Sequence, residues 1–465
     1  MKYTDITGTE EDLEKVIKKL KGVKSDLDIA TFKKQYDVSP TREILDTSLR
    51  PDKPILNERN ETQGVERPNR LAFPLQKRIV GSTVAFSFGK PVLLNCEPKD
   101  ETDKAILEAV KQIMDDNKID SHNRKVARNV AKCTEVAEVW FPVNTNEVHD
   151  DYGFDTSFKL RVQVFSPWDG NKLYPYYDQT GDMKAFSREF TQLEDGNEIT
   201  FFETYTDEEK IVWKRVQGVW GEFHKEPIAI GKIPVIYGHQ EQVEWHDVQS
   251  LIKRLEELMS NFADTNDYNG SPILVLTGQI LSMAKKGESG KMVQLDQGAK
   301  AEYASWDHAP ESIKLEIETL VRFVYSLSQT PDLSFDSVKG LDISGIAMKF
   351  LFSDAHLKVE EKREIFDAYL QRRINVVKAY VAMMAKKWEK EVRKLKIKPE
   401  IVPFLITNEK DLIDLLAEAS GGKALISQET AVEQSGLVKD AKGEYQKIKN
   451  EQKETADLNK LESTF

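Results

Sequence analysis

The sequence lacks several features that would place it in a familiar class. It has 2 cysteines among 465 residues, which is too few for a disulfide framework, so we expect a reducing compartment. No stretch approaches the ~18 consecutive apolar residues of a membrane-spanning helix. The first residues, MKYTDITGTEEDLEKVIKKL, are charged and lack the apolar run of a secretory signal. We therefore expect no membrane partner.

Positive charge is in deficit as well. The sequence has 66 Lys and Arg against 78 Asp and Glu, for a net charge of −12. A protein that wraps nucleic acid by neutralising its phosphates carries the opposite balance, although this charge does not exclude a protein through which DNA passes. Hydrophobic residues make up 40% of the chain, which indicates a foldable protein, and its length predicts two to four domains.

Motifs that carry chemistry are also absent. There is no HExxH, no CxxC and no G-x-S-x-G, and the strings nearest to a phosphate loop, at 287–292 and 421–424, are better explained as turns. His246 and Asp247 form either an acid–base pair or, more simply, a solvated helix start. Cys133 is either an activated thiolate or a packed thiol. No pattern favours an enzyme, and we expect no catalytic residue, no cofactor and no metal site.

Helical and extended patterns divide the first half of the chain. A charged helix is predicted within residues 1–30, and the proline-rich stretch 50–70 reads as a loop or arm. Further helices are predicted up to about Val84 and over 101–132, before a β-rich region at 134–238. The strands predicted in that region are 137–143, 158–165, 199–205 and 211–216. These patterns together predict an α+β protein.

The middle of the chain contains two one-sided helices around a small insert. The first is predicted over 244–268, and its apolar stripe is Trp245, Val248, Leu251, Ile252, Leu255, Leu258, Met259 and Phe262. After a β-like insert, Pro310 opens the second, whose stripe is Ile313, Ile317, Leu320, Val321, Val324 and Leu327. This order predicts an antiparallel hairpin. Since so narrow a hairpin buries little by itself, it must pack on the rest of the chain or beside other copies in a ring.

The remaining sequence is mainly helical. Residues 332–345 are rich in Gly, Ser and Asp and predict a loop, which a long helix over roughly 346–395 follows. A short strand is predicted at 400–404. The C-terminal stretch is polar and helical, with Ser427 as an N-cap.

Several strings in this half of the chain resemble the portal proteins of tailed bacteriophages. Their order and spacing matter more than any one of them, because they punctuate the plan of helix, insert, helix, loop and long helix. The strings are IAIGKIPVI (228–236), DVQSLI (247–252), SQTPDLS (328–334), KG…SGIAM (339–348), ISQETA (426–431) and EYQKIKNE (444–451). The likeness extends over roughly residues 70–455.

The resemblance implies a portal fold, which is mostly helical with a β-rich wing domain, a helical stem hairpin carrying a small α/β clip, a long C-terminal helix and a helical crown. The implied parts are the N-terminal arm and wing (1–243), stem helix 1 (244–268), the clip (269–309), stem helix 2 (310–330), the tunnel loop (331–345), the long helix and wing return (346–420) and the crown (421–465).

The resemblance also implies a function and partners. Copies would form a dodecameric ring at the capsid vertex, with double-stranded DNA packaged and ejected through its axial channel. The ring would dock the terminase large subunit, which holds the ATPase, and then the head–tail adaptor, and would contact the major capsid and scaffolding proteins. The protein would reside in the virion after assembly in the host cytoplasm. The alternative is a cytosolic metal-dependent enzyme that acts on nucleic acid through an unrecognised site.

The expected site residues are not catalytic. Tunnel-loop residues would make weak, sequence-independent contacts with DNA phosphates, a second set would lie on the channel face of the stem, and clip lysines would bind a partner. In each case a solvated surface residue is the simpler alternative. The three sets are Asp332, Ser334, Asp336, Ser337, Lys339, Asp342 and Ser344; Lys253, Arg254, Glu256 and Glu257; and Lys285, Lys286 and Lys291.

Overall fold

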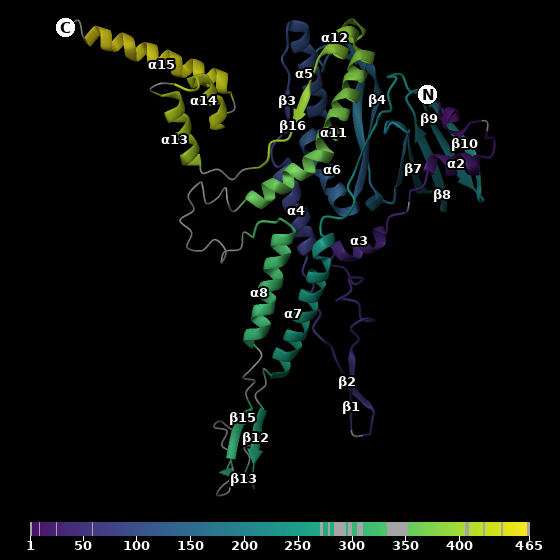
Figure 1. Ribbon diagram of the computed structural model, residues 1–465, viewed down its shortest axis with the longest axis vertical. Helices are drawn as coiled ribbons and strands as arrows, with labels where there is room; N and C mark the ends of the chain where they lie inside the picture. The colour runs from purple at the N-terminus through teal and green to yellow at the C-terminus, as the bar shows by residue number, and fades with distance from the viewer. Residues whose placement is uncertain are drawn as a thin grey trace. The chain divides into compact units, whose positions relative to one another are not determined.

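The computed structural model has an α+β architecture (Figure 1). It describes residues 2–8, 10–24, 26–57, 59–269, 273–277, 280–282, 294–295, 300–304, 310–332, 352–404, 409–421, 424–438 and 440–462. The chain divides into two compact units, one of Met1–Asp332 with Asp354–Phe404, the other of Leu333–Ser353 with Leu405–Phe465. Across the described ranges, no helix is both long and apolar enough to span a bilayer.

A five-stranded antiparallel sheet in the first unit has the order β10-β9-β8-β7-β6. The strands predicted at 199–205 and 211–216 are confirmed as β8 and β9, and Phe202 and Trp213 lie cross-strand on one face. The helices α1 (Tyr3–Thr7) and α2 (Leu13–Lys21) cover this face, where Val16, Ile17 and Leu20 complete the core. The strands are β6 (Lys172–Tyr177), β7 (Met183–Glu194), β8 (Asn197–Tyr205), β9 (Glu209–Val216) and β10 (Val219–Pro227).

A second, three-stranded sheet has the order β11-β4-β5 and confirms the strands predicted at 137–143 and 158–165. Side chains that include Phe186 and Val139 pack between the two sheets, and α6 packs on β4. The helix predicted over 101–132 is in fact two helices, because Lys118 adopts a left-handed backbone with φ of 50° between them. The elements are β4 (Glu135–His149), β5 (Thr156–Phe165), β11 (Val235–His239), α4 (Leu75–Phe88), α5 (Glu101–Asp116) and α6 (Ile119–Cys133).

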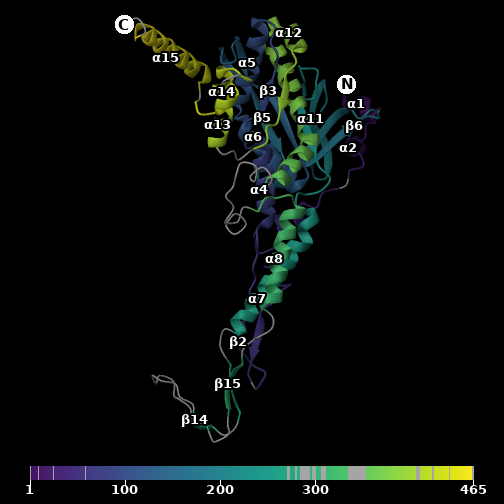
Figure 2. The same ribbon diagram turned by 60° about the vertical axis from the view of Figure 1, so that its left-hand side comes forward.

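Two helices of the first unit, α7 (Gln249–Asn269) and α8 (Pro310–Leu327), run side by side as the predicted hairpin (Figures 1 and 2). The insert contains two small antiparallel pairs, and Pro310 begins α8 as predicted. α7 starts later than expected, because the first residues of the predicted helix form the 3-10 turn η2 (His246–Val248), in which the amides of His246 and Val248 bond to the carbonyls of Val243 and Trp245. The other elements are η2 (His246–Val248), β12 (Ile273–Thr277) paired with β15 (Lys300–Ala304), and β13 (Ile280–Ser282) paired with β14 (Gln294–Leu295).

The segment predicted as a loop or arm contains regular structure. Strands β1 (Lys53–Leu56) and β2 (Thr62–Glu66) pair as an antiparallel hairpin. It follows α3 (Ile29–Tyr36) and belongs to a stretch, residues 39–73, that runs along α7 and that we call the arm. The prediction allowed a loop or an arm, and the pairing of β1 with β2 shows that part of this segment is regular strand instead of loop.

The long helix is α11 (Ser353–Met384), followed by η3 (Lys386–Trp388) and α12 (Glu389–Lys394). The first residues of the predicted helix, 346–351, lie outside the described residues. The strand predicted at 400–404 is wrong in position: β16 covers Lys398–Glu400 and pairs with β3 (Leu93–Asn95). Ile401 is instead buried beyond the end of the strand, so its apolar character reflects core packing.

The second unit is helical where it is described. It contains α13 (Glu409–Ser420), α14 (Gln428–Ser435) and α15 (Ala441–Glu462). The predicted N-cap is confirmed, since Ser427 Oγ accepts a hydrogen bond from the Thr430 amide at 3.1 Å.

Candidate functional site

The helical hairpin is the candidate functional element of the first unit. Most of the apolar stripe predicted on α7 is buried, including Ile252, Leu255 and Leu258. The stripe on α8 is mostly half-buried, and Val324 is its one fully buried member. Arg254 of α7 bonds to Glu316 of α8 at 2.9 Å. The two helices therefore pack through narrow apolar stripes, as the sequence predicts.

The arm holds the first half of α7 through a buried ion pair. Arg42 Nη2 lies 2.6 Å from Glu256 Oε1, and the side chains are 4% and 7% exposed. The Phe73 amide donates a second hydrogen bond to Glu256 at 2.8 Å. Arg42 also donates to the Gln35 carbonyl and to the Gln76 side chain. A single guanidinium thus joins the arm, α4 and α7.

The arm continues along α7 through polar contacts. Ser260 Oγ accepts from the Leu71 amide at 2.9 Å, and Asp264 accepts from the Asn69 amide at 2.6 Å. The guanidinium of Arg50 also bonds to Asp264. These contacts recur every three or four residues, so they follow one face of α7.

The residues predicted on the channel face of the stem have different surroundings. Lys253 pairs with Glu43 at 2.6 Å and Arg254 pairs with Glu316, all four side chains being about half exposed. Glu256 is buried against the arm, which excludes it from any exposed face of α7. Lys253, Arg254 and the half-buried Glu257 keep access to solvent. For Glu256, the prediction of a channel-facing residue is therefore wrong.

The other predicted contact residues lie mainly outside the described residues. This holds for the tunnel-loop residues Ser334, Asp336, Ser337, Lys339, Asp342 and Ser344, and for the clip lysines Lys285, Lys286 and Lys291. Asp332 is described, and it is half-buried just beyond α8.

A cluster that the sequence analysis missed joins the base of the hairpin to α11. We call it the base cluster and define it as Glu244, Lys358, Lys362 and Ser328. Glu244 pairs with Lys358 at 2.8 Å and with Lys362 at 3.1 Å, and Lys358 also donates to the Ser328 carbonyl at 2.7 Å. The cluster thereby ties the segments before α7 and after α8 to the same helix.

The charges of the base cluster perturb one another. Burial alone would raise the pKa of the Glu244 carboxyl, but Lys358 and Lys362 outweigh this effect and hold the pKa below its usual value. Burial lowers the pKa of Lys358, and Glu244 opposes that shift. The Glu244 carboxylate is therefore paired with both lysine ammonium groups, and these ion pairs have a structural role.

A second buried cluster lies under the three-stranded sheet. Arg373 of α11 makes a two-pronged contact with Glu138 of β4, at 2.6 and 2.8 Å, and His122 lies 2.6 Å from the same carboxylate. Burial would raise the pKa of Glu138, but Arg373 and His122 reverse the shift, so its pKa lies well below the usual value. A clue was present in the sequence, because Arg373 lies among Leu370, Ile374 and Val377 at helical spacing, and a charge among apolar residues needs a partner.

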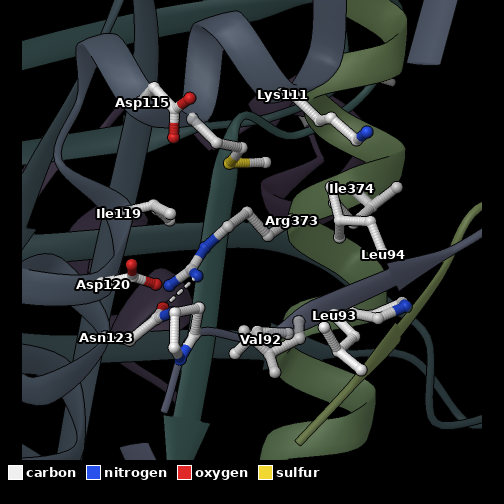
Figure 3. A pocket seen from close by; sticks show the side chains of 14 residues that line it. Val92, Leu93, Leu94, Lys111, Asp115, Ile119, Asp120, Asn123, Arg373 and Ile374 are labelled. Atoms are coloured by element: carbon white, nitrogen blue, oxygen red, sulfur yellow. Dashed lines mark hydrogen bonds between the residues drawn. The ribbon is translucent and has the colours of Figure 1, made fainter. Parts of the chain in front are cut away.

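A cavity of about 270 Å³ adjoins this cluster (Figure 3). The guanidinium of Arg373 reaches its wall and bonds to Asn123, while Lys111, Asp115 and Asp120 line other parts of it. Its apolar lining includes Val92, Leu94, Met114, Ile119, Leu370 and Ile374. Arg373 is committed to Glu138 and Asn123, so its own charge at this cavity is structural.

The residues considered for catalysis have simpler roles. Cys133 is buried, and this burial raises the pKa of its thiol, which confirms a packed thiol. His246 and Asp247 are exposed in η2 at the start of α7, as the simpler interpretation predicts. Within the described ranges, no three His, Cys, Asp or Glu side chains come together in a way that could hold a metal ion.

The chain is similar to proteins of one known family. The profile of one family, described as "Phage portal protein, SPP1 Gp6-like", matches residues 24–458. No curated protein matches the chain. One chain in a solved structure, "Neck of empty GTA particle computed with C6 symmetry", is similar with a TM-score of 0.43 and 8% identity; the match covers 79% of this chain and 91% of that chain.

Proposed function

The chain belongs to the SPP1 Gp6-like phage portal protein family, and from this premise we propose that its copies close a dodecameric ring around double-stranded DNA. It is a virion component involved in DNA packaging. It is a structural protein and not an enzyme, so the alternative of a metal-dependent enzyme is set aside. The match over most of the chain is the observation that carries the portal assignment.

The exposed side of α8 supports contact between copies. Leu315, Phe323 and Leu327 are 66%, 44% and 59% exposed. With about 100° per residue, Leu315 lies on the side of α8 opposite the half-buried stripe that packs on α7, and Phe323 lies about 90° from that stripe. Apolar side chains that the partner helix leaves uncovered are candidates for burial by another protein chain, which in a ring is the next copy.

The proposed channel should bind DNA only weakly, so that the DNA can pass through it. A net charge of −12 repels phosphates from much of the surface. We assign weak phosphate contacts to the tunnel loop (331–345) and retain Lys253, Arg254 and Glu257 as candidates for the channel face. Asp332, Asp336 and Asp342 would keep the loop from holding DNA tightly.

The remaining partners follow from the place of a portal at the capsid vertex. We propose that the clip (269–309), through Lys285, Lys286 and Lys291, binds the terminase large subunit during packaging and the head–tail adaptor afterwards. The wing and crown would contact the major capsid and scaffolding proteins.

Native mass spectrometry and electron microscopy of the full chain test the ring. We expect closed rings with an axial hole, and replacing both Leu315 and Phe323 by Asp should shift the protein toward monomers. The matched control is Val219→Asp on β10, a residue that is 71% exposed and away from the hairpin. A wild-type protein that stays monomeric under all assembly conditions would contradict the proposal.

A further inference from the structure

A second cavity of the first unit is lined by positive charge. It has a volume of about 450 Å³ and lies between α11, α12 and the turn that precedes β11. The described residues that line it include the three cations Lys232, Lys378 and Arg393 and no acidic side chain. Since the whole chain has a net charge of −12, this local excess of positive charge runs against the composition.

Lys378 is the half-buried lysine of this cavity. Its Nζ donates to the Leu395 carbonyl, which uses one of the three ammonium hydrogens. Burial lowers the pKa of Lys378, and the nearby charge of Lys232 lowers that pKa further. Among the described residues, no carboxylate pairs with either lysine. The two ammonium groups therefore repel each other, and an anion bound between them would remove this repulsion.

The other charges near this cavity are already paired or lie to one side. Arg393 bonds to Glu389 at 2.8 Å, and both side chains are exposed. An adjoining cavity that shares Lys232 also has acidic lining, from Asp182 and Asp207. The uncompensated positive charge therefore belongs to the two lysines, on the side of the cavity that α12 lines.

The charge and size of the cavity indicate a phosphoryl group as its ligand. A single carboxylate would neutralise one of the two lysines, whereas a phosphoryl group carries a charge of about −1.5 to −2 at pH 7. Asn375 of α11 lines the same cavity; its Oδ1 accepts from Gln371 at 3.5 Å, which leaves its amide nitrogen as a donor. Ala379, Ala382 and Val392 give another part of the wall an apolar surface. The volume of about 450 Å³ is typical of small-molecule sites.

We propose that this cavity binds a phosphoryl group, with Lys232 and Lys378 as its charged contacts and Asn375 as a hydrogen-bond donor. The inference goes beyond the proposed ring and does not depend on it, because all the lining residues belong to one unit of a single chain. A small phosphorylated molecule and the backbone of DNA both supply this chemistry, and the experiment distinguishes these two sources.

Isothermal titration calorimetry of the full chain with pyrophosphate tests the site. We expect the double variant Lys232→Met/Lys378→Met to bind pyrophosphate about tenfold or more weakly than the wild type, because it loses two charged contacts. The matched control Lys15→Met/Lys104→Met removes the same charge from lysines that are 64% and 60% exposed, and it should change the affinity by less than about twofold. Lys232→Met alone alters an exposed residue, so this variant should fold normally and still bind more weakly.

Three results would overturn the inference: no binding of pyrophosphate to the wild type, equal binding to the wild type and to Lys232→Met, or acetate bound as tightly as pyrophosphate. Competition with a short DNA duplex then identifies the source of the phosphoryl group. A duplex that displaces pyrophosphate from the wild type supports a site for the DNA backbone. Pyrophosphate that stays bound in the presence of the duplex supports a site for a small phosphorylated molecule.

Discussion

Arg42→Met should release the arm from α7. The Arg42 and Glu256 side chains are 4% and 7% exposed, and their closest atoms are 2.6 Å apart. The variant keeps a similar apolar stem but leaves the Glu256 carboxylate buried, with the Phe73 amide, 2.8 Å away, as its donor among the described residues. The substitution therefore leaves the buried charge of Glu256 without its ion-pair partner, which destabilises the contact between the arm and α7.

The expected loss of stability at the contact between the arm and α7 follows from that burial. Removing one partner of a buried pair costs about 3–5 kcal/mol. Since 1.4 kcal/mol is a factor of ten, amide exchange in the arm should accelerate about a hundredfold to several thousandfold, provided that the arm opens locally.

Hydrogen exchange followed by mass spectrometry over residues 41–73 measures this change. The matched control is Arg254→Met, which breaks a half-exposed pair and should cost about 0–1 kcal/mol. The double variant Arg42→Met/Glu256→Leu should recover much of the loss, because it removes both charges.

Equal protection in Arg42→Met and Arg254→Met would refute the reasoning, since burial would then have no energetic consequence at this pair. A double variant less protected than Arg42→Met would also contradict it, because the buried carboxylate could not be the source of the loss.

Three further predictions concern the first unit. Glu138 and Glu244 have folded-state pKa values below their unfolded ones, so their contribution to stability is present above about pH 4. It is lost as the pH falls through the folded-state values, and thermal melts should show a smaller acid-induced decrease in Tm for Glu244→Gln than for the wild type. Gly238→Ala would place a Cβ 2.8 Å from Tyr369 Cδ2. This overpacking should lower the free energy of unfolding by about 1–3 kcal/mol, which a urea titration measures. The control Gly221→Ala, whose Cβ meets nothing within 4 Å, should not lower it. Cys96 is partly exposed and Cys133 is buried, so a maleimide should label one thiol of the native chain and both only after unfolding.

The helical hairpin was predictable because its signal is local. Apolar residues at steps of three and four place α7 and α8, and Pro310 marks the start of the second helix. The strands β4, β5, β8 and β9 were predictable for the same reason, since the alternation of apolar and polar residues and the turn residues between strands are signals over a few positions. The start of α7 was misplaced because a 3-10 turn, η2, occupies the first residues of the predicted helix, and the apolar spacing there does not distinguish it from an α-helix.

The ion pairs that organise the site were not predictable in this way. Arg42 and Glu256 are 214 residues apart in the sequence, and Glu138 and Arg373 are 235 apart. Each looks like an ordinary surface charge until the fold brings its partner close. Glu256 was therefore assigned to an exposed face, although the arm covers it. The tunnel-loop and clip assignments rest on resemblance and stay predictions.

The base cluster has a consequence for how this chain tolerates change in length. Lys358 bonds to the Ser328 carbonyl and to Glu244, so the polypeptide that departs after Ser328 returns to the same point one turn into α11. Both anchor points lie in described structure, so insertions or deletions between Asp332 and Phe352 should leave the register of α8 and α11 untouched, which makes this stretch a place where related chains can diverge in size without redesigning the rest.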